Sequence, residues 1–146
     1  SATALVRALV SNGLRLPLVE ISGTRITTAA EILHEIAKTL FAWDADWRAR
    51  GGDPQRADLF GLTLIENPPD HFYPPPMVIL LDEADRLPRS LQGLLHAVVG
   101  SDDHVLPTET GCTVNCSRMA WFLATTDEEQ LIAGLDECVQ TIELEP

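Results

Sequence analysis

The chain has 146 residues and 45% hydrophobic content, which is enough for one domain with a sizeable core. Its 22 Asp and Glu residues against 10 Lys and Arg residues give a formal net charge of −12. This balance argues against nucleic-acid binding by the isolated chain, because phosphate contacts need clustered Lys and Arg; acidity that serves only solubility is the simpler explanation. No stretch approaches the roughly 20 apolar residues of a membrane span, and no signal peptide stands out, so we expect a cytoplasmic protein without membrane contact.

The N-terminal part predicts a helix followed by a strand. Residues 2–10 have helical hydrophobic periodicity, with Ser1 placed as the N-cap and Gly13 as a stop signal. Residues 16–22 are typical of a short strand that ends at Gly23. We expect the helix to bury one apolar stripe, made of Ala4, Leu5, Ala8 and Leu9.

A second helix is predicted over residues 29–47, with Thr27 or Thr28 as its cap. Its apolar residues recur at helical spacing: Ile32, Leu33, Ile36, Leu40 and Phe41. Glycines and a proline within residues 48–54 end it, and the type of any element in residues 55–65 stays undecided. Residues 66–76 carry five prolines and predict a loop.

The most informative segment is residues 77–84, MVILLDEA, in which five apolar residues run directly into Asp82 and Glu83. A continuous apolar run fits a strand that is buried on both faces of a parallel sheet. The two acids would then lie at the carboxyl edge of that sheet, where open α/β sheets bind ligands. Mg²⁺ is the usual cation for such carboxylates, together with substrate phosphate. A buried strand that ends in a solvated acidic turn is the alternative.

The second half of the chain continues the alternation. A helix is predicted to begin at Pro88, followed by a β-hairpin over residues 105–116 around Thr110 and Gly111. Residues 119–124 predict another buried strand, residues 127–137 a helix and residues 139–144 a last strand. This order predicts an α/β fold, with a parallel sheet covered by helices on both faces.

The three cysteines, Cys112, Cys116 and Cys138, do not indicate a disulfide framework, because their number is odd. Cys112 and Cys116 are four positions apart, and His104, the nearest histidine, stands alone, so the spacing does not match a zinc site. We expect semi-buried thiols rather than a metal centre.

The string Asp82 to Pro88, DEADRLP, resembles the Walker B segment of P-loop ATPases of the AAA+ family. The resemblance assigns Asp82 to the Mg²⁺ shell and Glu83 to the polarisation of the attacking water. Residues 119–126, MAWFLATT, are similar to the sensor-1 strand of that family, whose polar tip meets the γ-phosphate. Thr125 and Thr126 are both candidates for this role, and a hydroxyl there can equally be a helix cap.

The resemblance covers nearly the whole chain. It implies that residues 1–146 form a single AAA+-like three-layer core with an inserted β-hairpin. Within the family, the likeness is closest to the bacterial Holliday-junction branch-migration motor or clamp-loader subunits, and Clp-type unfoldase modules share much of the pattern. The core is expected to be incomplete, because the strand that carries the phosphate loop and the C-terminal lid are not in this chain.

Two departures from the AAA+ pattern bear on function. No segment matches the phosphate loop G-x-x-x-x-G-K-S/T, and the single lysine, Lys38, lies within a predicted helix. The first helix resembles the one that follows that loop, which places Ser1 where the loop's hydroxyl residue would bind the nucleotide. Glu137 falls where the family has its arginine finger, and a carboxylate there would repel the nucleotide.

Two functions follow from the resemblance. The first is the ATPase core of a ring-forming motor that couples Mg-ATP hydrolysis to the remodelling of DNA or protein, in a homo- or hetero-oligomeric ring. The second is a non-catalytic AAA+-like assembly or regulatory subunit, which Glu137 and the acidic charge favour. A small α/β protein of another kind is the third alternative. The sequence leaves the remodelled substrate, the subfamily and the ring stoichiometry open.

Overall fold

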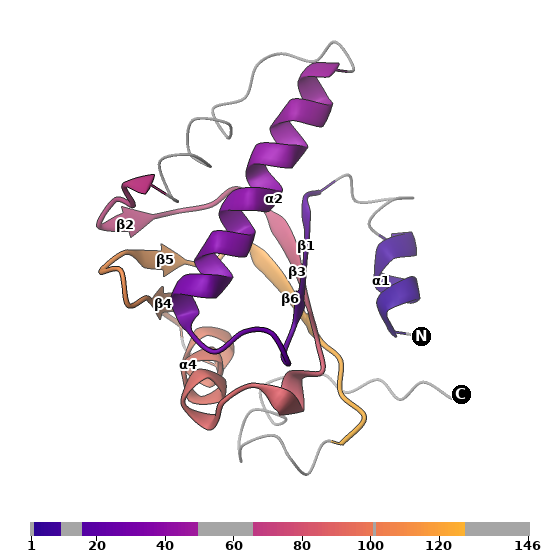
Figure 1. Ribbon diagram of the computed structural model, residues 1–146, viewed down its shortest axis with the longest axis vertical. Helices are drawn as coiled ribbons and strands as arrows, with labels where there is room; N and C mark the ends of the chain where they lie inside the picture. The colour runs from indigo at the N-terminus through magenta and orange to yellow at the C-terminus, as the bar shows by residue number, and fades with distance from the viewer. Residues whose placement is uncertain (1, 10–15, 50–65, 101, 128–146) are drawn as a thin grey trace.

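The computed structural model describes residues 2–9, 16–49, 66–100 and 102–127. Its elements form a main sheet, a smaller second sheet and helices around them (Figure 1). The helices are α1 (Ala2–Leu9), α2 (Ala29–Ala49) and α4 (Arg89–Gly100), and a short 3-10 turn, η2, spans Ala84–Arg86. The strands are β1 (Leu18–Ser22), β2 (His71–Phe72), β3 (Met77–Asp82), β4 (Val105–Pro107), β5 (Thr113–Asn115) and β6 (Met119–Leu123).

The main sheet is parallel, with the strand order β1-β3-β6. β3 lies in the middle, and the side chains of residues 77–81 are all buried, which confirms the predicted doubly covered strand. Ser22 is paired with Asp82, and Leu81 with Leu123, so the three strands end side by side at one edge of the sheet.

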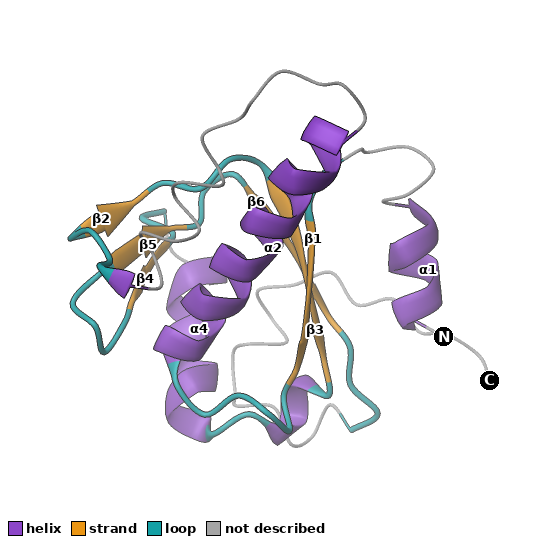
Figure 2. Cartoon of the chain, turned by 45° about the horizontal axis from the view of Figure 1, so that its top comes forward, coloured by secondary structure: helices purple, strands orange, loops and turns teal. Residues whose placement is uncertain are grey.

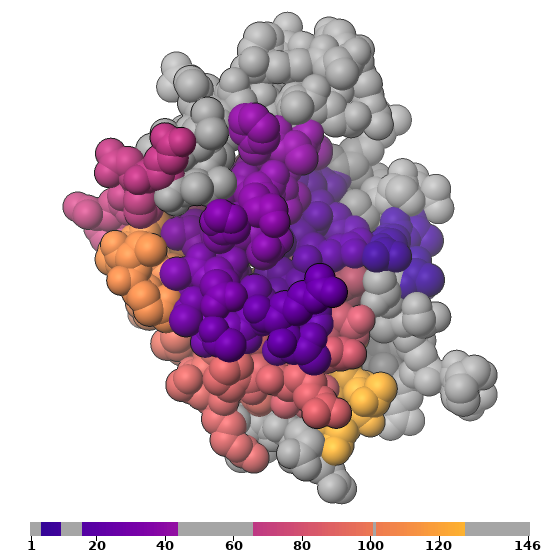
Figure 3. Space-filling view, in the orientation of Figure 1, coloured from indigo at the N-terminus to yellow at the C-terminus, as the bar shows by residue number. Residues whose placement is uncertain are grey.

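Helices cover both faces of this sheet. Successive side chains of a strand point to opposite sides, so each face of β3 has its own set of contacts. Ile79 and Leu81 belong to the large core under α2 and α4, whereas Val78 and Leu80 pack against Val6 of α1. Figure 2 shows α1 on one side of the strands and α2 and α4 on the other. The space-filling view shows α2 spread over the face toward the viewer, with α4 below it (Figure 3). The predicted α/β class is therefore confirmed.

The N-terminus of α2 is capped from within its own sequence. Thr28 is the cap, since its Oγ1 accepts a hydrogen bond from the Glu31 N–H at 3.3 Å. The hydroxyls of Thr27 and Thr28 donate to Glu31 Oε1 at 2.7 and 3.2 Å. These bonds stabilise the ionised carboxylate and hold the pKa of Glu31 below its ordinary value.

A second carboxylate, from a distant part of the chain, completes this cap. β4 and β5 pair antiparallel, and the turn between them carries Glu109. Glu109 Oε2 accepts the Ala30 N–H at 2.8 Å, and its Oε1 accepts the Ala29 N–H at 3.4 Å. The free amides of the first helical turn therefore meet a negative charge, which the helix dipole favours.

The predicted apolar stripe of α1 is wrong. Leu5 and Leu9 are 46% and 50% exposed, and Ala4 and Ala8 are exposed as well, whereas Val6 is buried. Val6 packs against Val78 and Leu80 of β3, and burial of its side chain sets which side of the short helix faces the sheet. Next to it, the Arg7 guanidinium donates to the Glu20 carboxylate on β1, with Nε 2.6 Å from Oε1, and this exposed pair lowers the pKa of Glu20.

Three further expectations need correction. β6 is not a buried strand like β3: it lies at the edge of the described sheet, Ala120 is exposed, and its other residues are half-buried. Residues 66–76 are not entirely a loop, because His71 and Phe72 form β2 and pair in parallel with β5. The prolines lie on either side of these two residues and leave their amides available, and Phe72 is buried in the core. Phe41, expected in the buried stripe of α2, is 44% exposed, while Ile32, Leu33, Ile36 and Leu40 are buried as predicted.

The predicted helix at residues 127–137, the strand at residues 139–144, Ser1 and Glu137 lie outside the described residues apart from Asp127. In the described part of the chain, none of the helices combines the length and the apolar character that crossing a membrane requires.

Candidate functional site

The candidate site is built from the tips of the three parallel strands. On one side of the acidic turn, the Gly23 N–H donates to the Asp82 carbonyl at 2.8 Å. On the other side, the Ala124 N–H donates to the Leu81 carbonyl at 2.9 Å, and the Ala84 N–H donates to the Ala124 carbonyl at 3.0 Å. Backbone hydrogen bonds thus hold the turn after β3 between the chain segments that leave β1 and β6.

Asp82 and Glu83 are exposed at this edge, directly after the buried residues of β3. Glu83 has a left-handed backbone, with φ 54° and ψ 46°, which an L residue other than Gly adopts only at a cost of about 1–2 kcal/mol. Asp82 Oδ1 accepts the Glu83 N–H at 2.9 Å and so supports this conformation. A strained non-glycine residue of this kind is typical of functional sites.

Ser22, at the tip of β1, contacts the acidic pair from the side. Its Oγ lies 2.8 Å from Thr24 Oγ1, and it donates a long hydrogen bond of 3.5 Å to Glu83 Oε2. The sequence interpretation did not select Ser22 as a site residue. The available signal was a hydroxyl residue followed by glycine at the end of a predicted strand, and no pattern linked it to an acid 61 positions away.

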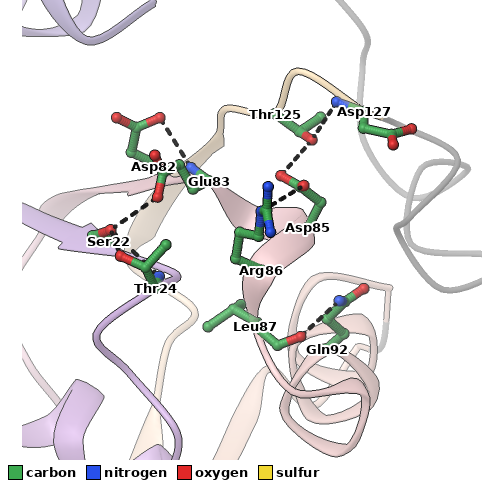
Figure 4. A network of polar contacts seen from close by, with 10 residues as sticks. All are labelled: Ser22, Thr24, Asp82, Glu83, Asp85, Arg86, Leu87, Gln92, Thr125 and Asp127. Atoms are coloured by element: carbon green, nitrogen blue, oxygen red, sulfur yellow. Dashed lines mark hydrogen bonds and ion pairs between the residues drawn. The ribbon is translucent and has the colours of Figure 1, made fainter.

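The hydroxyl of Thr125 is directed at a third acid rather than at Glu83. Thr125 Oγ1 donates to Asp85 Oδ1 at 2.8 Å and accepts the Asp127 N–H at 3.0 Å. The Asp85 side chain is 7% exposed, and Arg86 Nε lies 3.7 Å from its Oδ2. Figure 4 shows this cluster on one side of the turn, with Asp82 on the other.

Thr126 differs from its neighbour. It is exposed, and its hydroxyl has no hydrogen-bond partner among the residues that the structure describes. The structure therefore brings Asp82, Glu83, Thr125 and Thr126 to the same edge of the sheet, but gives the two threonines different surroundings. The bond from the Asp127 amide to Thr125 also matches the alternative of a turn-capping hydroxyl.

A hollow of about 350 Å³ opens beside the tips of β1 and β3. Ser22 and Asp82 line it, together with three basic side chains, Arg7, Arg25 and Lys38. Arg7 is paired with Glu20, and Lys38 Nζ lies 3.3 Å from Glu35 Oε1. Glu20 and Glu35 line the hollow as well, so its basic and acidic side chains are balanced, and the exposed Asp82 carboxylate lies at its edge.

Metal binding at this edge would depend on Asp82. Within residues 2–9, 16–49, 66–100 and 102–127, no three His, Cys, Asp or Glu side chains gather in a position to hold an ion. Mg²⁺ needs no such group, because it keeps several waters and is bound through one or two carboxylates and substrate phosphates. The exposed Asp82 carboxylate fits that mode. Burial raises the pKa of the Cys116 thiol to about 12, and burial together with Asp70 raises that of Cys112.

The comparisons with known proteins identify no family. No protein-family model matches the chain, and no curated protein is significantly similar to it.

Proposed function

We propose that this chain is the ATPase core of a ring-forming motor of the AAA+ type, which uses Mg-ATP hydrolysis to remodel DNA or protein. The observation that carries the proposal is the Asp82–Glu83 pair. It leaves a fully buried parallel strand at the edge where two neighbouring strands also end, and Glu83 adopts a strained left-handed backbone there. Ligands of open α/β sheets bind outside the carboxyl ends of the strands.

Each residue then has a separate role. Asp82 would hold Mg²⁺, directly or through water, and the ion would supply the charge that neutralises the phosphoryl oxygens. Glu83 would orient the attacking water and accept its proton, and the Ser22 hydroxyl, 3.5 Å from Glu83 Oε2, would steady that carboxylate. Thr126 is the better of the two threonines for contacting phosphate, because Thr125 already donates its hydroxyl proton to Asp85.

The proposal includes a finer description of the fold than the α/β class. The main sheet with its helices would correspond to the AAA+-like three-layer core, and β4 and β5 to its inserted hairpin. Residues 105–116 contain no Lys or Arg, so a DNA contact would have to come from another part of the ring. Ser1 would contribute to the nucleotide site from the start of α1.

A non-catalytic assembly subunit is the second candidate. It is favoured by the lack of a phosphate-loop motif in the 146 residues, by Glu137 at the position that the resemblance gives to the arginine finger, and by the net charge of −12. The position of Asp82 and Glu83 at the edge where three parallel strands end favours the catalytic function instead.

The experiment uses the protein as its gene encodes it, so that any residues upstream of Ser1 are included. The unmodified protein should bind and hydrolyse Mg-ATP, and Glu83→Gln should lower turnover by about 100-fold or more while nucleotide affinity stays unchanged. Glu66→Gln, at an exposed glutamate far along the chain from the site, is the control and should leave both quantities unchanged. Unchanged turnover in Glu83→Gln would exclude Glu83 as the base, and a protein that binds no ATP would support the assembly subunit.

A further inference from the structure

Asp85 is a buried acid to which the proposed reaction gives no role. Its side chain is 7% exposed, although Asp82 and Glu83, in the same turn, are both exposed. A buried carboxylate is costly unless charged or hydrogen-bonding groups compensate it. Thr125 donates to it at 2.8 Å, and Arg86 Nε lies at 3.7 Å. The contact with Thr125 joins two segments 40 positions apart in the sequence.

This contact is one link in a series that ties β6 to the acidic turn. The Ala84 N–H donates to the Ala124 carbonyl, Thr125 donates to Asp85, and the Asp127 N–H donates to Thr125 Oγ1. Glu83 lies within the same turn, and its own carbonyl accepts the Arg86 N–H at 2.9 Å. The backbone on both sides of Thr126 is thereby fixed relative to Glu83.

We propose that Asp85 is a positioning residue of the proposed ATPase site, so this inference rests on the function proposed above. By binding the hydroxyl of Thr125, Asp85 fixes the tip of β6 relative to the turn that carries Glu83, so that Thr126 and Glu83 keep one relative arrangement. Asp85 touches neither nucleotide nor water. Its loss should slow the chemical step, which depends on sub-ångström placement, more than it weakens nucleotide binding.

The kinetic test compares matched pairs of variants in the full-length protein. Asp85→Ala and Thr125→Val should each lower kcat by about 10- to 100-fold with KM for Mg-ATP within about twofold, since a misplacement of about 1 Å can cost that much. Asp85→Asn and Thr125→Ser keep an acceptor and a donor and should retain kcat within about threefold. The double variant Asp85→Ala/Thr125→Val should be no slower than either single variant, because both remove the same contact. Asp102→Ala, at an exposed aspartate, should change nothing.

Hydrogen exchange supplies a measurement that does not depend on ATP. Asp85→Ala and Thr125→Val should speed exchange of the Asp127 amide by about tenfold or more, because its acceptor is no longer held, while the Gly23 amide on the other side of the turn is unaffected. Faster exchange with unchanged kcat would show a purely structural contact and overturn the inference. Unchanged exchange would overturn it as well, even in an active enzyme.

The two proposals fail in different ways. If Asp85→Ala and Thr125→Val speed exchange of the Asp127 amide but the unmodified protein shows no turnover, the ATPase function is wrong. Asp85 then has a structural contact only. If Glu83→Gln abolishes turnover while Asp85→Ala and Thr125→Val leave kcat unchanged, the ATPase function stands and the positioning role of Asp85 is wrong.

Discussion

At Gly23, the segment that leaves β1 lies directly against the backbone of the turn after β3. A Cβ atom at this position would lie 2.1 Å from the Glu83 carbonyl oxygen and 3.0 Å from its carbonyl carbon. Both are backbone atoms, so the clash cannot be relieved by rotating a side chain. The absence of a side chain at Gly23 is therefore what allows the strained Glu83 turn to lie against the tip of β1.

Replacing Gly23 by alanine should destabilise the protein by about 1–3 kcal/mol, because the backbone of the acidic turn has to move. Gly93→Ala is the matched control. Gly93 lies inside α4 with no atom within 4 Å of a Cβ atom there, so alanine should stabilise the protein by about 0.5–1 kcal/mol. Urea denaturation measures both changes. Equal effects in the two variants would contradict the close approach.

The cap of α2 shows how elements far apart in the sequence are joined. Thr28 and Glu31 are close in the chain and were partly predictable, since Thr27 and Thr28 both preceded a helical pattern. Glu109 could not be predicted in this role, because its partner amides lie 79 and 80 positions away. Its carboxylate fixes the turn between β4 and β5 against the start of α2.

Glu109→Ala should lower the free energy of unfolding by about 1 kcal/mol, because two amides of the first turn lose their acceptor. Glu109→Gln keeps an acceptor oxygen but loses the charge, so its effect should be smaller. Glu66→Ala, at an exposed position, serves as the control. Thermal denaturation at low salt measures the three variants, and an alanine variant as stable as the control would exclude the cap.

The limits of the sequence prediction are clearest at α1 and β2. Eight residues make only about two helical turns, so the periodicity of α1 could not separate Val6 from Leu5 and Leu9. The buried residue, Val6, packs against Val78 and Leu80 of β3, which are more than 70 positions away in the sequence. β2 has two residues and therefore no period to detect.

At the candidate site, the features formed by neighbouring residues could be predicted from the sequence, and the contacts between distant residues could not. Five apolar residues before Asp82 and Glu83 were enough to predict a buried strand with two acids at its end, and β3 has those bounds. The contacts of Ser22 with Glu83 and of Asp85 with Thr125 depend on strand order and register, which hydrophobic patterning does not specify. The ATPase role of the acids stays a prediction.

At the scale of the whole molecule, one hydrophobic core connects the two sheets. It contains Phe72 of β2, Leu106 of β4 and Val114 of β5 together with Ile79 and Leu81 of β3. Cys112 and Cys116 belong to the same core and are 1% and 3% exposed. Because they share this core, the two sheets are expected to unfold together in a single transition.

The two buried thiols report on that transition. Cys138 lies outside the described residues, so the experiment uses a Cys138→Ser background. At pH 8, the remaining thiols should react faster with a disulfide reagent as the urea concentration rises. This increase should follow the change in tryptophan fluorescence that marks unfolding. Reaction of either thiol well before the main transition would show that the smaller sheet opens separately.

The pKa of Cys116 adds a pH dependence to the same measurement. Burial raises this pKa from 9.0 to about 12, so the folded protein keeps a proton that the unfolded chain releases above about pH 9. The contribution of the neutral thiol to stability is complete below pH 9 and is lost as the pH rises toward 12. The urea midpoint should therefore fall over that window, and Cys116→Ala should reduce the slope.

The parallel order β1-β3-β6 also has a consequence for how the protein reaches its native state. Parallel strands cannot pair through a tight turn, and here the tips of β1 and β3 meet across 61 positions. High contact order slows folding, because closure of long loops precedes the gain from pairing. Until α2 and α4 cover it, the apolar β3 segment is exposed to other nascent chains and is a site of aggregation. The strand tips come together only when all three strands are in register, so we expect the acidic turn to form late in folding.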